Sequence, residues 1–126
     1  MKNNILLIIA KQNNKMVAGA LNFIGEGTLY GRNWGAIVNI PFLHFELCYY
    51  QAIDYAIEKN IKIIEAGAQG HHKIQRGYVA KSTYSSHYIQ NASFAKAVRN
   101  FVNLEAREIG KQIEIINQRG SPYSNN

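Results

Sequence analysis

Apolar segments separated by polar turn residues occupy the first third of the chain, as in consecutive β-strands. Three segments show this pattern and are rich in Ile, Val, Phe and Tyr: ILLIIAK from Ile5, KMVAGALNFI from Lys15 and TLYGRNWGAIV from Thr28. Turn residues separate them, because Asn13-Asn14 tolerates positive φ at the first reversal and Gly25-Glu26-Gly27 supplies it at the second. The pattern predicts an antiparallel meander.

The period changes from 2 to 3.6 after Pro41, which predicts a helix over residues 43–60 with Asn60 as its C-terminal stop. One broad arc of this helix is expected to face the sheet, and it comprises Phe45, Tyr49, Tyr50, Ala52, Ile53, Ala56 and Ile57. Glu46 falls on the same arc. Its carboxylate therefore either caps free amides in the first helical turn or lines a site.

Two more strands and a second helix complete the predicted fold. IKIIEAGA (61–68) predicts a buried strand parallel to an earlier one, and STYSSHYI (82–89) has β composition. Ser93 is expected to cap a helix that runs from about Phe94 to about Ile116. The order βββ-α-β-β-α describes an α+β fold with a mixed sheet, which we expect to form one domain over residues 1–117 with a disordered tail over 118–126.

The net charge indicates the kind of partner, and the cysteine content indicates the cellular compartment. Lys and Arg number 14 against 8 Asp and Glu, a net charge of +6 that favours anionic partners, although the charges are scattered as on an ordinary solvated surface. The single cysteine, Cys48, excludes a disulfide framework and a thiolate metal site. ILLIIA is too short for a membrane span or a signal-peptide core, so a reducing, cytoplasmic location is expected.

The segment EAGAQGHHKIQRGY (65–78) concentrates polar chemistry without an apolar pattern. Glu65 lies near the carboxyl end of a predicted strand, where open α/β sheets usually bind ligands, and an ion pair with Lys73 or Arg76 is the alternative. The glycine amides, Gln69, the imidazoles and the two cations could hold an anion or a carbonyl oxygen. The segment lacks the Gly-Lys-Ser/Thr ending of a Walker loop, so nucleoside triphosphate binding is not expected.

Histidines and aromatic residues add further candidates. No His-x-x-x-His or Cys-x-x-Cys spacing occurs, so no metal site is expected, whereas any histidine could serve as a general base. Most aromatic residues lie at core spacing. Trp34 and Tyr78, each beside a glycine, are the ones expected to stack on a ligand.

Three segments, LYGRNWGA, LHFELCYYQAIDYAIEKNIKIIEAGAQGHHKIQRGY and TYSSHYI, together resemble a bacterial family of predicted N-acyltransferases. Its members are described as peptidoglycan biosynthesis/recognition proteins related to the Fem-type aminoacyl transferases. The resemblance covers about residues 28–108, with the segments in the family's order and spacing. It implies the acyltransferase fold of the GNAT superfamily, which agrees with the predicted element order.

The resemblance and the residue chemistry together select the candidate site. Candidate catalytic residues are Glu46, Glu65 and His72. Candidate substrate-binding residues are Arg32, Trp34, His44, Gln69, Gly70, Lys73, Arg76, Tyr78 and His87. The family commonly has Glu at position 71 and Cys at position 36, where this chain has His71 and Ala36.

The leading hypothesis is transfer of an acyl or aminoacyl group to an amine, with a cell-wall precursor as the acceptor. An aminoacyl-tRNA or a coenzyme A thioester is the expected anionic donor, although the chain lacks the Gln/Arg-x-x-Gly-x-Gly/Ala loop that grips coenzyme A. The resemblance implies longer proteins, of which this chain looks like the C-terminal portion. A truncated, inactive module that binds a precursor or a partner chain, including a second copy, is the alternative, and nonspecific nucleic-acid binding is a third.

Overall fold

The computed structural model describes residues 2–67 and 71–119. The chain divides into two compact units, Met1–Gly67 and Ala68–Asn126.

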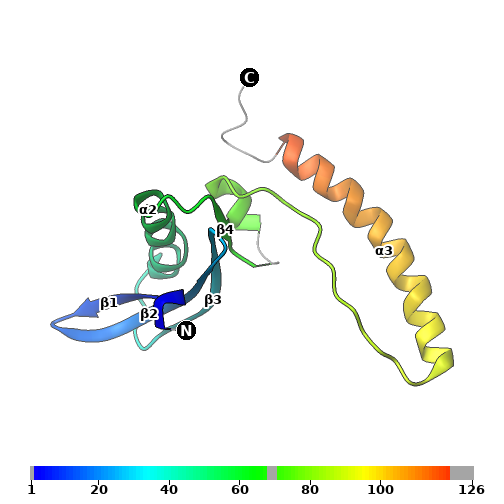
Figure 1. The fold of residues 1–126 in the computed structure, drawn as a ribbon, viewed down its shortest axis with the longest axis horizontal. Coiled ribbons are helices and arrows are strands. Elements are labelled where there is room, and N and C mark those ends of the chain that lie inside the picture. Colours follow the sequence, from blue (N-terminus) through cyan, green and yellow to red (C-terminus); the bar gives the residue numbers. More distant parts are fainter. Residues whose placement is uncertain (1, 68–70, 120–126) are drawn as a thin grey trace. The chain divides into compact units, whose positions relative to one another are not determined.

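The first unit contains a four-stranded mixed sheet in the order β1-β2-β3-β4 (Figure 1). A 3-10 turn, η1 (Lys2–Asn4), precedes the strands β1 (Ile5–Gln12), β2 (Lys15–Gly25), β3 (Thr28–Ala36) and β4 (Ile63–Glu65). The first three strands pair antiparallel, and β4 pairs parallel to β3. The predicted meander, the parallel strand and the α+β class are therefore confirmed.

Both reversals of the meander use the residues expected from the sequence. Asn13 and Asn14 have φ of 50° and 61°, and Glu26 and Gly27 have φ of 51° and 74°. Two successive positive-φ residues form the turn type whose twist matches that of the flanking strands. These turns set the register that brings β2 between β1 and β3.

The predicted helix over residues 43–60 forms, but in three consecutive parts. They are α1 (Leu43–Phe45), the π-helical turn η2 (Glu46–Tyr50) and α2 (Gln51–Glu58). Asn60, at φ 54°, ends the helix as expected. A π-helical turn holds more residues per turn than an α-helix and rotates every later side chain about the axis.

This rotation changes which side chains face the sheet. Leu47, Tyr49, Ala52 and Ala56 are buried, whereas Tyr50 and Ile57 are 45% and 71% exposed. The prediction that Tyr50 and Ile57 face the sheet is therefore wrong, because it assumed 3.6 residues per turn throughout.

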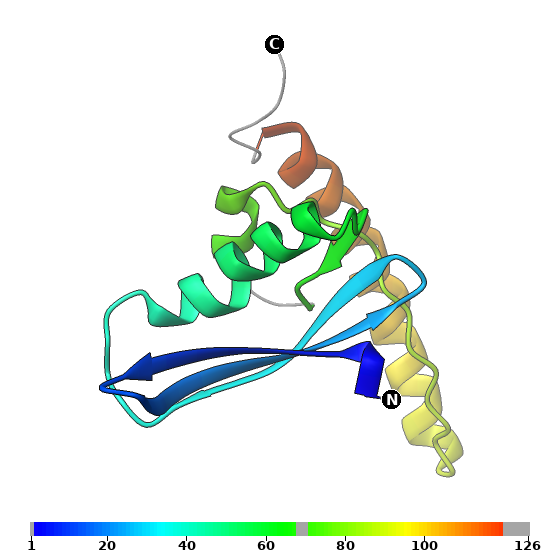
Figure 2. The ribbon, with the colours of Figure 1, turned by 60° about the vertical axis from the view of Figure 1, so that its left-hand side comes forward.

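The helix covers one face of the sheet (Figure 2). Ala18 and Ala20 of β2 form the core with Leu47, and Ile8 and Ala10 of β1 pack against this cluster. The small alanine side chains allow the helix to approach the strands closely, and Leu29 of β3 is fully buried.

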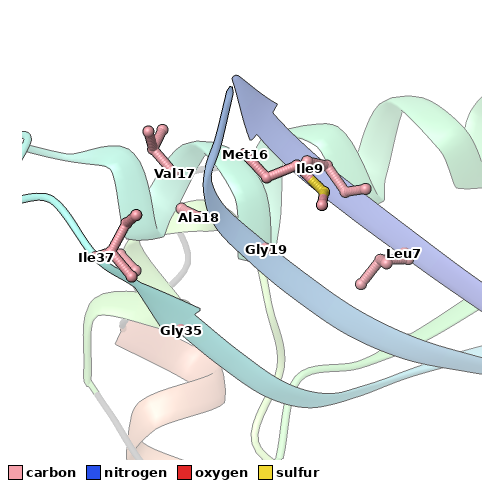
Figure 3. Close-up of a pocket in the computed structure, with 9 residues that line it drawn as sticks. Leu7, Ile9, Met16, Val17, Ala18, Gly19, Gly35 and Ile37 are labelled. Carbon is pink, nitrogen blue, oxygen red and sulfur yellow. The ribbon is translucent and has the colours of Figure 1, made fainter. Parts of the chain in front are cut away.

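The opposite face of the sheet carries an open apolar hollow of about 470 Å³ (Figure 3). Leu7 and Ile9 of β1 reach into it, with Met16 of β2 and Ile37 beyond β3. Within residues 2–67, no helix lies over this face. Strand β4 is likewise more open than expected, since Ile63 is 51% exposed.

The second unit consists of a 3-10 turn, an extended segment and a long helix. The turn η3 (His71–Arg76) ends at Gly77, whose φ is 86°, and α3 spans Ala92–Arg119. Helix α3 confirms the predicted second helix. The predicted tail lies mostly outside the described residues, and the predicted extent of the domain stays a prediction.

Two predictions in the second unit are wrong. Residues 82–89 form no strand: they are extended and pair with no other strand in the described part of the chain, and Tyr84 and Tyr88 are more than 90% exposed. The cap of α3 is Asn91 and not Ser93, because Asn91 Oδ1 accepts from the Phe94 backbone N–H at 2.9 Å. Ser93 Oγ instead donates to the same oxygen at 2.7 Å.

Candidate functional site

A pocket of about 190 Å³ lies between the sheet and the beginning of the helix in the first unit. Strands β2 and β3, the α1–η2 turn and the residue after β4 all contribute to it. Its lining consists of Ala20, Leu21, Asn22, Gly31, Arg32, Asn33, Trp34, His44, Cys48, Tyr49 and Ala66. The pocket brings together three predicted substrate-binding residues, Arg32, Trp34 and His44.

A β-bulge in β3 explains why four consecutive residues of one strand line the pocket. Leu21 of β2 pairs with Asn33, but the next residue, Asn22, pairs with Gly31, so Arg32 is an extra residue. A bulge interrupts the alternation of side chains and redirects them locally. This local irregularity places a cation and an indole on the rim of one pocket.

Three aromatic rings form one wall of the pocket. The Trp34 and His44 ring centroids are 5.1 Å apart at 59°, and those of His44 and Tyr49 are 5.6 Å apart at 84°. His44 and Tyr49 are five residues apart, a spacing that a π-helical turn brings to one side of the helix. Tyr49 is 4% exposed, so this wall is anchored in the core.

Asn22 forms the polar floor of the pocket and was missed by the sequence analysis. It is 2% exposed, and among the described residues its side chain makes one hydrogen bond, from Nδ2 to the Ala20 carbonyl oxygen at 3.4 Å. A buried amide without good partners costs roughly 1–3 kcal/mol. The available signal was an amide in the middle of the apolar strand KMVAGALNFI.

Cys48 adds a neutral group to the lining. Burial raises the pKa of its thiol to about 11. The thiol is therefore protonated at neutral pH, and it is neither a nucleophile nor an anionic ligand there.

Glu46 does not face the sheet. It is exposed, and its Oε1 accepts a hydrogen bond from Gln51 Nε2 at 2.8 Å. The i to i+5 spacing of this pair is that of the π-helical turn, whose backbone bond also runs from the Gln51 N–H to the Glu46 carbonyl. The expectation that Glu46 lies on the sheet-facing arc is thus wrong for the same reason as for Tyr50.

Glu65 is also outside the pocket. Glu65 pairs with Tyr30, which pairs in turn with Phe23, so the three side chains lie on one face of the sheet. Phe23 follows Asn22, which lines the pocket, and therefore points to the face away from the helix. The next residue, Ala66, lines the pocket. Glu65 is exposed. The structure does not bring Glu46 and Glu65 together in this pocket.

The remaining predicted residues belong to the second unit. His72 and Arg76 are linked within η3, where Arg76 Nη1 donates to the His72 carbonyl oxygen at 2.7 Å. Burial lowers the pKa of Lys73, whose carbonyl oxygen accepts from the Tyr78 N–H at 3.2 Å.

His87 is exposed and lies 2.9 Å from Ser85 Oγ, measured from its Nε2. The predictions for Gln69 and Gly70 lie outside the described residues.

The described residues contain no group of three or more His, Cys, Asp or Glu side chains arranged to hold a metal ion. In the same part of the chain, no helix has the length and apolarity needed to cross a membrane.

Comparison with protein families finds a family model that matches the chain. The family model described as FemAB-like, peptidoglycan biosynthesis/recognition, matches residues 1–125. Comparisons with curated proteins and with solved structures found no match. Because the family model matches nearly all of the sequence, the chain belongs to the FemAB-like family of peptidoglycan biosynthesis/recognition proteins.

Proposed function

We propose that this chain is an acyltransferase-type domain with a partial GNAT-like fold, which transfers an acyl or aminoacyl group to an amine of a cell-wall precursor. The observation that carries the proposal is the pocket beside the β3 bulge, where an imidazole, an indole and a guanidinium meet in a member of a peptidoglycan biosynthesis family. Membership of this family supports a cell-wall precursor as the substrate, and the pocket is the proposed binding site for it.

The chemistry needs a neutral amine and a group that accepts its proton. The amine nitrogen attacks the donor carbonyl carbon, a new C–N bond forms, and the alcohol or thiol of the donor leaves with the electron pair of the broken bond and a proton. His44 is the imidazole that lines the pocket, so we assign it the role of general base. Glu65 and His72, the candidate bases proposed from the sequence, stay as alternatives.

The donor is expected to be anionic. Both an aminoacyl-tRNA and a coenzyme A thioester carry phosphates, and the net charge of +6 favours either one. Arg32 lies exposed at the rim of the pocket. Lys73 and Arg76 are the further cations proposed for donor binding.

A transfer assay tests this function on the full chain. The acceptor is a soluble precursor peptide with a free lysine amine, and the two donor classes are assayed in parallel. His44→Gln should lower transfer by at least about 100-fold, the lower bound for loss of a general base. Asn103→Ala on the exposed side of α3 is the control and should leave transfer unchanged.

The second candidate function is recognition of a precursor without transfer. One observation favours it: neither Glu46 nor Glu65 lines the pocket. Saturable binding of the precursor peptide together with no transfer from either donor would establish the binding module and overturn the enzyme.

A further inference from the structure

The side chain of Asn22, at the floor of the pocket, has hydrogen-bonding groups that are mostly unpaired within residues 2–67. An asparagine side chain has two N–H donors and an oxygen with two lone pairs. Within residues 2–67, Asn22 uses a single N–H, in a bond of 3.4 Å that is near the limit for a hydrogen bond. Since the side chain is 2% exposed and lines the pocket, its remaining groups are directed at whatever fills that space.

Gly31 leaves space beside the Asn22 oxygen. A Cβ at position 31 would lie 3.7 Å from Asn22 Oδ1 and 3.5 Å from the carbonyl oxygen of Glu65. These are ordinary van der Waals distances, and Gly31 does not have positive φ, so alanine fits the backbone there. Its methyl group would nevertheless stand beside the amide oxygen and block a ligand's approach to it.

The arrangement is complementary to one chemical group. A secondary amide is trans, so its N–H and its carbonyl oxygen point in opposite directions, and Asn22 Oδ1 can accept a hydrogen bond from the N–H of such an amide. At the rim, the guanidinium of Arg32 makes no ion pair within the described residues and can bind a carboxylate with two parallel hydrogen bonds. The aromatic wall between floor and rim suits the flat, apolar part of such a molecule.

The size of the pocket agrees with a small unit of this kind. A unit the size of one acetylated amino acid suits a pocket of about 190 Å³, whereas a sugar–peptide conjugate is much larger.

We propose that this pocket is a subsite for an acylamino carboxylate, in which Asn22 recognises the secondary amide and Arg32 the carboxylate. Asn22 and Gly31 are then the residues that determine specificity for an amide over an ester. The inference rests on the proposed function for its setting, because peptides of a cell-wall precursor contain such units, but binding is measurable without transfer.

The single tryptophan makes the test direct. Trp34 is the only tryptophan of the chain and lines the pocket, so its indole N–H gives one resolved side-chain signal in a ¹⁵N–¹H correlation spectrum. N-acetylalanine is titrated into the full-length protein, alongside its ester analogue O-acetyllactate and the neutral N-acetylalaninamide. A saturable shift is expected for N-acetylalanine, with at least tenfold weaker binding of both analogues.

Two glycine variants provide a matched pair. Gly31→Ala should weaken N-acetylalanine binding at least tenfold, whereas Gly35→Ala, with nothing within 4 Å of the new methyl group, should leave it unchanged. Arg32→Gln should abolish the preference for N-acetylalanine over N-acetylalaninamide and keep the preference over the ester. If Gly31→Ala does not fold by circular dichroism, Asn22→Ala takes its place with the same expected loss.

The outcomes separate this inference from the proposed function. No saturable shift, equal binding of the ester, or equal affinities of the two glycine variants would each overturn the amide subsite. Transfer activity that persists in the absence of N-acetylalanine binding would retain the enzyme and refute the subsite. Amide-selective binding without transfer would establish the subsite and refute the enzyme.

Discussion

At the scale of single residues, burial in the pocket wall changes the acidity of a side chain. Cys48 shows this most clearly, because burial raises the pKa of its thiol to about 11. A thiol that stays protonated reacts slowly with alkylating reagents, which attack through the thiolate.

We predict that Cys48 resists iodoacetamide at pH 8 in the folded protein and reacts readily in urea. The difference should disappear as the pH approaches 11, the pKa of the folded state. Mass spectrometry of the alkylated chain measures both rates. Equal rates in the folded and unfolded chain at pH 8 would show that the thiol is not protected.

The same shift makes stability depend on pH. The unfolded thiol ionises near its ordinary pKa of 9.0 and the folded thiol near 11, so between these values the unfolded state releases a proton that the folded state retains. The contribution of Cys48 is therefore complete below pH 9 and is lost as the pH rises toward 11. Urea denaturation at pH 8 and pH 10.5 should show a larger loss of unfolding free energy for the natural chain than for Cys48→Ala.

At the scale of elements, both helices were predicted correctly, but the sheet-facing side of the first helix and the N-terminal cap of the second were not. The helix over residues 43–60 was predictable from its apolar period, but its π-helical turn was not, because no sequence period marks a single wide turn. The cap of α3 was placed two residues late, since Ser and Asn are both good caps and only the backbone shows which oxygen reaches a free amide.

The cap of α3 can be tested with two adjacent substitutions. Asn91→Ala removes the oxygen that accepts from the Phe94 N–H and should destabilise the helix by about 1 kcal/mol. Ser93→Ala keeps that bond and should cost less. Helicity by far-ultraviolet circular dichroism during thermal unfolding compares them, and a larger effect of Ser93→Ala would restore the original cap.

The segment 82–89 had strand composition without a strand partner in the described chain. β-propensity reflects packing on a sheet, so composition alone does not create a ladder. We predict that backbone amides at 83–88 exchange with deuterium much faster than those of β2, which is paired on both sides. Protection equal to that of β2 would mean that this segment is paired in solution.

At the scale of the whole molecule, the sheet has an open apolar face opposite the helix. Leu7 is 55% exposed in the apolar hollow. Association with a second copy was part of the alternative function considered from the sequence, that of a truncated module. If a second copy covers this face, Leu7→Lys should lower the mass measured by light scattering toward that of a monomer. Ile57→Lys, at a position 71% exposed on α2, is the matched control and should leave the mass unchanged.

The sequence by itself determined the local structure of this protein: three antiparallel strands, a parallel fourth strand, two positive-φ turns and two helices, together with its family. These features depend on neighbouring residues, whose period and turn chemistry can be read along the chain. The tertiary structure alone decided which side chains meet. The π-helical turn directed Glu46 away from the sheet, the register of β4 with β3 set Glu65 on the other face, and the bulge at Arg32 brought four consecutive residues of β3 to the pocket.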